Sequence, residues 1–493
     1  MTRSVVALAY SRPSALESSQ AGQLLGLETS GGLTPRGAEP HPRFFAGFLA
    51  SPRIAARGLL AVADVASARY YRRTLATSLD PVVTGNGDRL RFESFSGCCG
   101  VYARLDVLQD GLDGAETGHG TTNVDVNNPL REALSRVAGD DPLHLRVGPQ
   151  EMAVTTPDGP VVEKKVPLPD RWLRGFAESQ VASAGFDLRA ELSAVEAVTF
   201  LRSLPRSSGN ASRGAQWVVP AGKSLRPTTR PTAGAVYLPG PERLAALRRV
   251  LRHATALRVY GPVTDGTAAA SAWELVLPGM RLTLTLSPDA SRGFSGEGGV
   301  LDALATGDAA ADAELVSVLL AWEPRIEPAD LAEQSGLAVE RVRAALTRLS
   351  TAGRVGYDLA DAAYFHRELP YDADRAERHN PRLVAIRQLA GSGAVALDGE
   401  LAAVASGERR YQVREKGGVL SCTCQWWADY RGRRGPGDRT GPVPQLVAAI
   451  DCRSTARPAG RRGTAGHPAG VPASFPLAGQ SAPSGPPPLL PRG

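Results

Sequence analysis

The sequence has few cysteines and few aromatic residues for its length. Only 5 of its 493 residues are Cys, and 6% are aromatic. So few cysteines exclude a disulfide scaffold, and the cores must depend mainly on Ala, Val and Leu. No run of about 18 apolar residues is present, so we expect no membrane-spanning helix. The first ten residues lack the apolar segment of a signal peptide. We therefore predict a reduced, cytoplasmic protein without a membrane partner.

The common sequence signatures of catalysis and nucleotide binding are also missing. The chain contains no GxxxxGK[ST], no GxGxxG after a strand, no GxSxG and no HExxH. No pair of carboxylates is marked by its spacing either. The sequence therefore predicts a non-enzymatic protein and identifies no small-molecule substrate.

The length predicts two to four domains of an α+β multidomain protein. Phe44 to Leu49 recur at helical spacing, whereas residues 80–166 alternate like strands and turn at Pro157-Asp158-Gly159. Pro241 to Thr255 is typical of an amphipathic helix. The predicted order is an N-terminal α+β domain over 1–203, a linker over 204–233, a small α/β unit over 234–306, a three-helix module with two strands over 307–370, a connecting helix over 371–394, a β-hairpin unit over 395–440 and a disordered tail over 441–493.

Residues 307–370 have the clearest local pattern. Two helices, a Gly turn, a third helix over Val339–Thr351 and two strands follow one another, and this order resembles a winged helix-turn-helix. That family places its third helix in the DNA major groove. The resemblance implies that Arg341, Arg343 and Arg348 are exposed for phosphate or base contact. The alternative is a winged helix used for packing or for protein contact.

Positive charge is concentrated near the C-terminal end. Residues 405–493 carry 13 Lys and Arg but five acidic residues, a balance of +8, while the other residues sum to −2. A basic segment beside a nearly neutral body is typical of a protein with a polyanion partner. Arg-rich tails also arise from GC-rich coding bias, so charge alone leaves both explanations open.

Cys422 and Cys424 form a Cys-x-Cys pair after a predicted strand. Residues i and i+2 of a strand point to the same side, so both sulfurs would face one point. Two converging thiolates suit zinc, at Zn–S distances of about 2.3 Å. Trp426 and Trp427 follow directly and could shield the sulfurs from water. The alternative is two ordinary reduced thiols.

The segment from Tyr411 through Cys422-Thr423-Cys424 to Gly435-Pro436 resembles the SWIM zinc finger family, and bacterial members of it in particular. The family pattern is a β-hairpin that ends in Cys-x-Cys, then a basic spacer with Gly-Pro, then Cys-x-His at the start of a helix. The resemblance implies bound zinc and a role in DNA or protein interaction. It covers under a tenth of the chain, roughly residues 395–436.

The second half of that pattern is missing. Gly437 to Pro442 stand where Cys-x-His should follow, and the remaining candidate ligands are Cys452 and His467. Residues 454–493 contain nine Pro and seven Gly, which predicts disorder. One hypothesis is that the reading frame shifts near residues 435–437. The zinc finger is therefore expected to be partial.

The sequence as a whole predicts a zinc-binding, SWIM-type scaffold for nucleic acid or protein. Zinc would fix the end of the hairpin and hold Arg431, Arg433 and Arg434 on one exposed loop, where they would contact phosphates. The alternative is a protein–protein adaptor with a defective zinc site and no affinity for nucleic acid.

Overall fold

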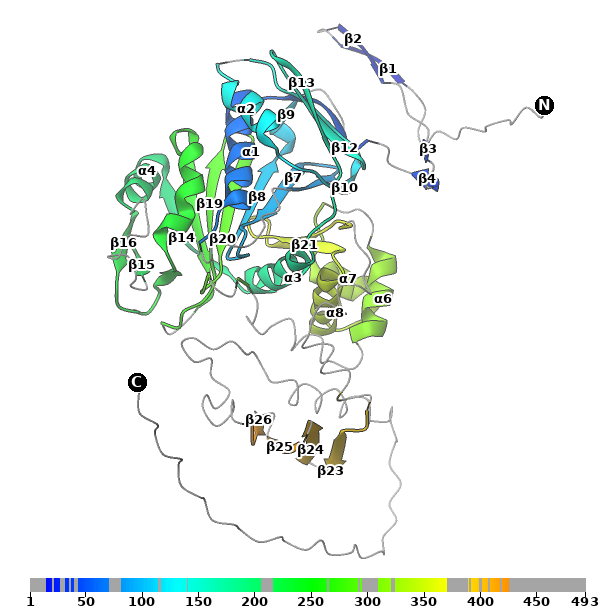
Figure 1. Ribbon diagram of the computed structural model, residues 1–493, viewed down its shortest axis with the longest axis vertical. Coiled ribbons are helices and arrows are strands. Elements are labelled where there is room, and N and C mark those ends of the chain that lie inside the picture. The colour runs from blue at the N-terminus through cyan, green and yellow to red at the C-terminus, as the bar shows by residue number, and fades with distance from the viewer. Residues whose placement is uncertain are drawn as a thin grey trace, which may run out of the picture. The chain divides into compact units, whose positions relative to one another are not determined.

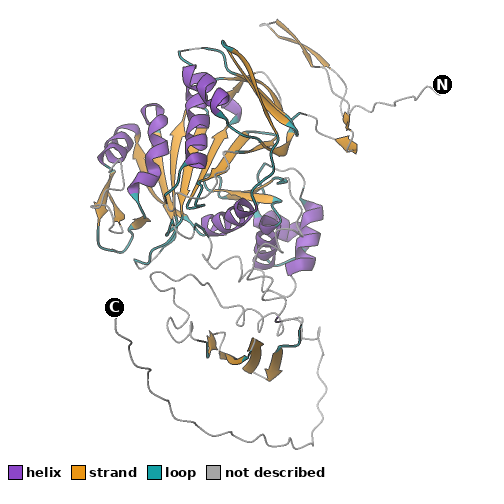
Figure 2. Cartoon of the chain, in the orientation of Figure 1, coloured by secondary structure: helices purple, strands orange, loops and turns teal. Residues whose placement is uncertain are grey.

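The computed structural model describes residues 15–19, 22–26, 32–34, 37–39, 43–70, 81–113, 117–139, 141–204, 216–263, 266–290, 293–294, 309–320, 324–369, 389, 392–398, 401–406, 408–416 and 419–424. Helices and antiparallel sheets alternate along these residues, which confirms the α+β class (Figure 2). Within the described residues, no helix combines the length and the apolar character needed to cross a membrane.

An eight-stranded antiparallel sheet is the largest element of the protein (Figure 1). Its strands, in spatial order, are β10 (His119–Asn123), β6 (Val82–Asn86), β7 (Leu90–Phe95), β8 (Val101–Val107), β20 (Met280–Leu286), β19 (Ser271–Leu277), β18 (Ala256–Gly261) and β14 (Asp187–Ser193). β8 pairs with β20 along its whole length, Val107 opposite Met280 and Val101 opposite Leu286. This sheet therefore joins segments of residues 1–203 and 234–306, and the division between those two predicted units is wrong.

Two smaller antiparallel sheets accompany the large one. One has the order β13 (Gly159–Lys164), β12 (Glu151–Thr156), β11 (His144–Val147), β5 (Phe45–Leu49) and β9 (Leu112–Asp113). The other has the order β16 (Ser224–Thr228), β15 (Gln216–Ala221) and β17 (Val236–Leu238). The turn at residues 157–159 joins β12 to β13, as predicted.

Two sequence-based predictions fail in these sheets. Phe45–Leu49 is a strand, because burial alternates along it and β11 pairs with it. Residues 216–228, placed in the predicted linker, form β15 and β16, since Trp217 and Leu225 are buried. In both cases tertiary pairing overrides a local pattern.

Helices cover the apolar face of the large sheet. α1 (Pro52–Ser67) begins with Pro at its first turn, where the missing N–H costs nothing, and it buries Leu59, Leu60 and Val62 against the sheet core. α2 is Asn128–Arg136 and α4 Ala194–Ser203, and η1 is a short 3₁₀ turn at Gln109–Gly111. α3 (Asp170–Ala184) lies on the other face, where Trp172 and Phe176 pack with Phe95 and Tyr102. The helix predicted over Pro241 to Thr255 consists of two 3₁₀ segments, η3 (Pro241–Arg249) and η4 (Leu251–His253).

The module after residue 307 has its elements in the predicted order. These are α6 (Ala309–Leu319), α7 (Pro328–Ser335), α8 (Val339–Thr351), β21 (Val355–Asp358) and β22 (Ala363–His366). Val342, Leu346 and Leu349 of α8 join one small core with α6, α7 and β21. Gly353 ends the helix in the left-handed region, with φ of 67°, which favours glycine.

The C-terminal described strands form a separate four-stranded sheet, β23 (Val395–Asp398), β24 (Leu401–Ser406), β25 (Arg409–Lys416) and β26 (Val419–Cys422). Near the N-terminus, β1 (Ala15–Ser19) pairs with β2 (Gly22–Gly26), and β3 (Gly32–Thr34) pairs with β4 (Gly37–Glu39). The predicted connecting helix over 371–394 and the tail over 441–493 lie almost entirely outside the described residues.

Candidate functional site: a docked hairpin and a Cys-x-Cys strand end

The second face of the large sheet has a row of buried charged side chains on β7, β8 and β20. Side chains alternate between the faces, so Leu90 and Phe92 lie in the apolar core while Arg91 and Glu93 point the other way. The strand register then sets opposite charges beside each other. Arg91 lies opposite Asp106, Glu93 opposite Arg104, and Arg281 opposite Asp106.

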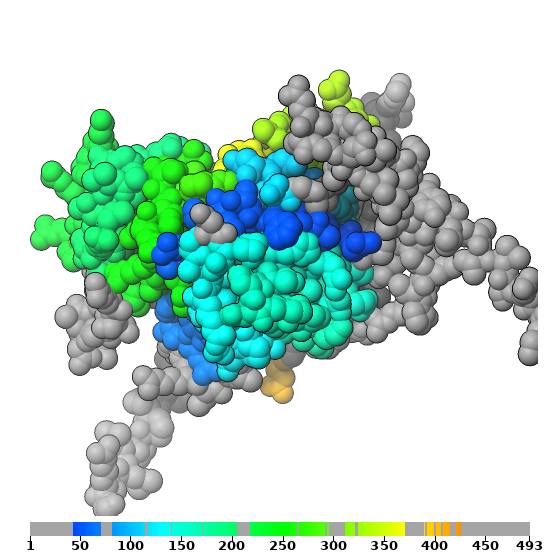
Figure 3. All heavy atoms as spheres, turned by 90° about the horizontal axis from the view of Figure 1, so that it is seen from above, coloured from blue at the N-terminus to red at the C-terminus, as the bar shows by residue number. Residues whose placement is uncertain are grey.

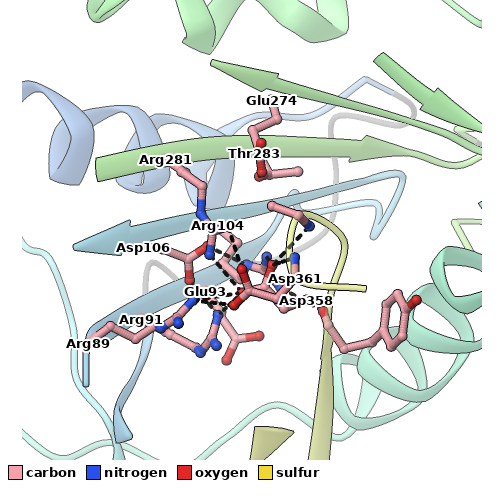
Figure 4. Close-up of polar contacts among 12 residues, drawn as sticks. Arg89, Arg91, Glu93, Arg104, Asp106, Glu274, Arg281, Thr283, Asp358 and Asp361 are labelled. Carbon is pink, nitrogen blue, oxygen red and sulfur yellow. Dashed lines mark hydrogen bonds and ion pairs between the residues drawn. The ribbon is translucent and has the colours of Figure 1, made fainter. Parts of the chain in front are cut away.

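The turn that follows β21 closes over this polar face. Asp358 has only 1% of its surface exposed, and its carboxylate accepts hydrogen bonds from Arg91 at 2.7 Å and from Arg281 at 2.9 Å (Figure 4). Arg104 lies 3.1 Å from the other carboxylate oxygen. Arginines from three strands of the sheet, β7, β8 and β20, therefore contact Asp358 of the hairpin.

The edge of this network reaches solvent. Asp361 accepts hydrogen bonds from Arg89 at 2.7 Å and from Arg281 at 3.1 Å, and its side chain is 22% exposed. Arg104 also donates to the main-chain carbonyl of Tyr357 at 2.6 Å. The contacts with the sheet thus extend along the turn from residue 357 to residue 361.

The charges in this network stabilise one another. Burial alone would raise the pKa of the Asp358 carboxyl, but the surrounding guanidinium groups, that of Arg104 first, hold it well below its usual range. Asp358 is therefore ionised at neutral pH. Such a carboxylate is indispensable to its partners, because an unpaired buried arginine is costly.

A second set of contacts fastens β22 and the end of α8. Arg367 pairs with the buried Glu93 at 2.7 Å, and the Arg91 guanidinium lies 3.8 Å from the centre of the Phe365 ring. Gln180 of α3 donates a hydrogen bond to Ser350 of α8. The tip of the hairpin and the C-terminal turn of α8 therefore both face the body of the protein.

The three arginines predicted as exposed on α8 differ in their surroundings. Arg341 and Arg343 are exposed, and Arg348 is half-buried. Arg341 forms a two-bond ion pair with Asp312 of α6, at 2.6 and 2.8 Å. Thr347 is buried, so the outward face of α8 is confined mainly to its N-terminal half.

Cys422 and Cys424 come together at the end of β26. The main-chain N–H of Cys424 donates to the Cys422 sulfur at 3.4 Å, and the two thiols interact. Both side chains are buried, at 6% and 5% exposure, beside Ala402, Val404 and Val413. Burial raises the pKa of the Cys422 thiol to about 12, so without a cation this sulfur remains protonated at neutral pH.

The remaining predicted ligands and contacts lie outside the described residues. These are Cys452, His467, Arg431, Arg433 and Arg434. In the part of the chain that is described, no group of three or more His, Cys, Asp or Glu side chains is arranged to hold a metal. A tetrahedral zinc site needs four ligands, of which the two described thiols could supply two.

Sequence reasoning missed the charge network, although it left a signal. Arg91 and Glu93, and again Arg104 and Asp106, stand two residues apart in neighbouring strands that are otherwise apolar. Charges at that spacing lie on one face of each strand, so they indicate ion pairs between neighbouring strands on the face opposite the apolar core. The partner, Asp358, is more than 250 residues away and has no local mark.

Comparison with known proteins yields only distant structural likeness. No family model and no curated protein matches the chain. The proliferating cellular nuclear antigen of Entamoeba histolytica matches with a TM-score of 0.33 and 10% identity, over 50% of this chain and 99% of that one. A PCNA2–PCNA3 complex from Sulfolobus tokodaii gives 0.35 and 10%, over 50% and 100%, and a β sliding clamp of C. crescentus gives 0.32 and 13%, over 49% and 64%. At these TM-scores the likeness carries no argument about function.

Proposed function

We propose that the protein is a non-enzymatic interaction scaffold whose Cys422 and Cys424 belong to a zinc site of the SWIM type. The observation that carries this proposal is that both cysteines are buried together at the end of β26, where the main-chain N–H of Cys424 donates to the Cys422 sulfur, in a small sheet with few other core residues. Zinc bound there would replace the thiol protons and cross-link the strand end to the following chain.

A bound cation would contribute strongly to the stability of the β23–β26 sheet, because the apolar core of this sheet is small. The core of β23–β26 includes only Ala402, Val404 and Val413 besides the two cysteines, with a few half-buried neighbours. A sheet of this size gains little from apolar burial alone, so a metal cross-link would supply a large part of its stability. The third and fourth ligands would come from residues after Cys424, with Cys452 and His467 as candidates.

A specific observation favours the alternative of a protein–protein adaptor. In the winged helix-turn-helix that α6 to β22 resemble, the wing and the third helix face the nucleic acid. Here the wing would be the β21–β22 hairpin, and its tip is occupied by Asp358 and Asp361 in contact with the sheet. A docked, acidic wing tip disfavours DNA contact through this module.

Zinc content tests the metal site directly. Purified wild-type protein is expected to contain about one zinc per chain, and Cys422→Ser and Cys424→Ser to lose nearly all of it. Cys98→Ser, which removes a half-buried thiol elsewhere, is the matched control and should retain the metal. Wild-type protein without zinc, when prepared and assayed in zinc-containing buffer, would leave only the adaptor with a defective site.

A further inference from the structure

Four arginines gather on one surface of the protein, at the junction of α1 with η3 and η4. Arg53 and Arg57 stand one helical turn apart in the first half of α1, and Arg249 and Arg252 come from the two 3₁₀ segments. Arg53 and Arg57 are half-buried, while Arg249 and Arg252 are exposed. The blue segment that contains α1 reaches the surface between the green and cyan parts of the chain (Figure 3). We call these four residues the arginine patch.

The arginine patch has little compensating negative charge. Asp64, two turns further along α1 from Arg57, pairs with Arg249 and is shared with Arg131 of α2. Arg252 donates to the ring nitrogen of His253, which is not an anion. Among the described residues, neither Arg53 nor Arg57 forms an ion pair with a carboxylate.

The local electrostatics are unfavourable to the folded chain. Two like charges at i and i+4 of a helix cost about 0.2–0.5 kcal/mol, and positive charge in a first turn opposes the helix dipole. α1 has no acidic residue in its first turn and no side chain capping its N-terminus. Burial and the three neighbouring guanidinium groups lower the pKa of Arg57. Burial and nearby arginines also lower the pKa of His253.

We propose that the arginine patch binds the phosphodiester backbone of a nucleic acid. Guanidinium groups present two donors to a phosphate in a fixed plane, which makes arginine the preferred side chain for such contacts. Two rows of arginine, one on α1 and one on η3 and η4, offer several phosphates a contact at once. The N-terminal end of α1, whose first turn contains Arg53, adds the positive end of its dipole.

This inference goes beyond the zinc-type scaffold and does not depend on zinc. It moves the nucleic-acid surface away from α8, where Arg341 already has a carboxylate partner and the wing tip is docked. The patch lies on the helix-covered side of the large sheet, while the docked hairpin covers the opposite, polar face. Nucleic acid on the patch would therefore not compete with the hairpin for its site.

The test compares two double variants that remove the same charge from different places. Arg57→Gln with Arg252→Gln removes two charges of the patch, and Arg226→Gln with Arg230→Gln removes two exposed arginines at β16. Binding to a fluorescein-labelled duplex DNA and to the RNA duplex of the same sequence is measured by anisotropy over a salt series. The patch variant should bind about tenfold more weakly and lose about two units of the slope of log K against log salt. The β16 variant should match the wild type.

Thermal unfolding separates loss of binding from loss of fold. The patch variant should be as stable as the wild type or more stable, because it loses only mutually repelling charges. Equal weakening by both double variants, or no binding by wild type at low salt, would overturn the proposal. So would loss of binding in Arg341→Gln with Arg343→Gln but not in the patch variant. Zinc content of the same preparations tests the scaffold separately, so either idea can fail alone.

Discussion

Replacement of Asp358 by Asn is the strongest single perturbation that the described residues offer. The side chain keeps its shape, and the remaining oxygen can still accept the main-chain N–H of Ala360, now at 3.1 Å. The negative charge is lost, however, and an amide group is turned toward buried guanidinium groups. Removal of one partner from a buried ion pair costs about 3–5 kcal/mol.

The structure places Asp358→Asn in the upper part of that range. The side chains of Arg91, Arg104 and Arg281 are 0%, 2% and 7% exposed, so water cannot replace the lost carboxylate. Asp106 is then the main anion left to those three arginines. Since domains are stable by only about 5–15 kcal/mol, the hairpin should detach from the sheet before the rest of the protein unfolds.

Hydrogen exchange measured by mass spectrometry distinguishes local release from global unfolding. Amides of β21 and β22 should exchange about a hundredfold faster or more in Asp358→Asn, while those of β7, β8 and β20 stay protected. Asp361→Asn is the control, because its carboxylate is partly solvated and its loss should cost about 1 kcal/mol or less. Unchanged exchange of the hairpin in Asp358→Asn would refute the idea that this network holds it.

Two further predictions concern pH and a close backbone contact. Burial, with the charges of Arg354 and His119, lowers the pKa of His366 from 6.5 to about 4. The unfolded chain therefore takes up a proton first as pH falls, so stability should drop by about 3 kcal/mol from pH 6.5 to pH 4. His366→Gln should flatten that part of a urea-midpoint profile, and an unchanged profile would exclude this histidine as the cause. Gly111→Ala should lower the unfolding midpoint strongly, by about 2 kcal/mol or more, because the new methyl would lie 2.3 Å from the Gly279 carbonyl oxygen. Equal stability of wild type and variant would show that this contact relaxes freely.

Local patterns predicted most individual elements but not how they assemble. α8 was predicted with its observed bounds, because Val342, Leu346 and Leu349 recur at helical spacing and Gly353 ends the helix. Phe45–Leu49 was misread because its phenylalanine spacing suits either period, and only pairing with β11 decides for a strand. The eight-stranded sheet could not be predicted, because no local pattern in β8 indicates that it pairs with β20.

The candidate sites too were predictable only where their residues are close together in the sequence. The Cys-x-Cys pair is a local feature, so the sequence could identify it directly, and Cys422 and Cys424 are both buried at the end of β26. The winged-helix resemblance implied that Arg348 of α8 is exposed, but this side chain is half-buried, and α3 lies against that end of the helix. The arginine patch joins residues almost 200 positions apart, and no local pattern could assemble it.

Arginine side chains occur in two contrasting environments in this protein, one buried and paired with carboxylates, the other at the surface. Arg91, Arg104 and Arg281 are buried, and the carboxylates of Asp106 and Asp358 lie within hydrogen-bond or ion-pair reach. Carboxylates within the fold neutralise these three arginines, so replacing any of them should lower stability. In the arginine patch only Arg249 has a carboxylate partner among the described residues, Asp64, and Arg57 lies close to the other three arginines, whose charges repel its own. Loss of the patch should affect stability little or favourably. Such a surface lowers the stability of the free protein, and binding of an external polyanion would supply the missing negative charge. Substitution at the patch should therefore weaken binding while leaving stability unchanged or higher.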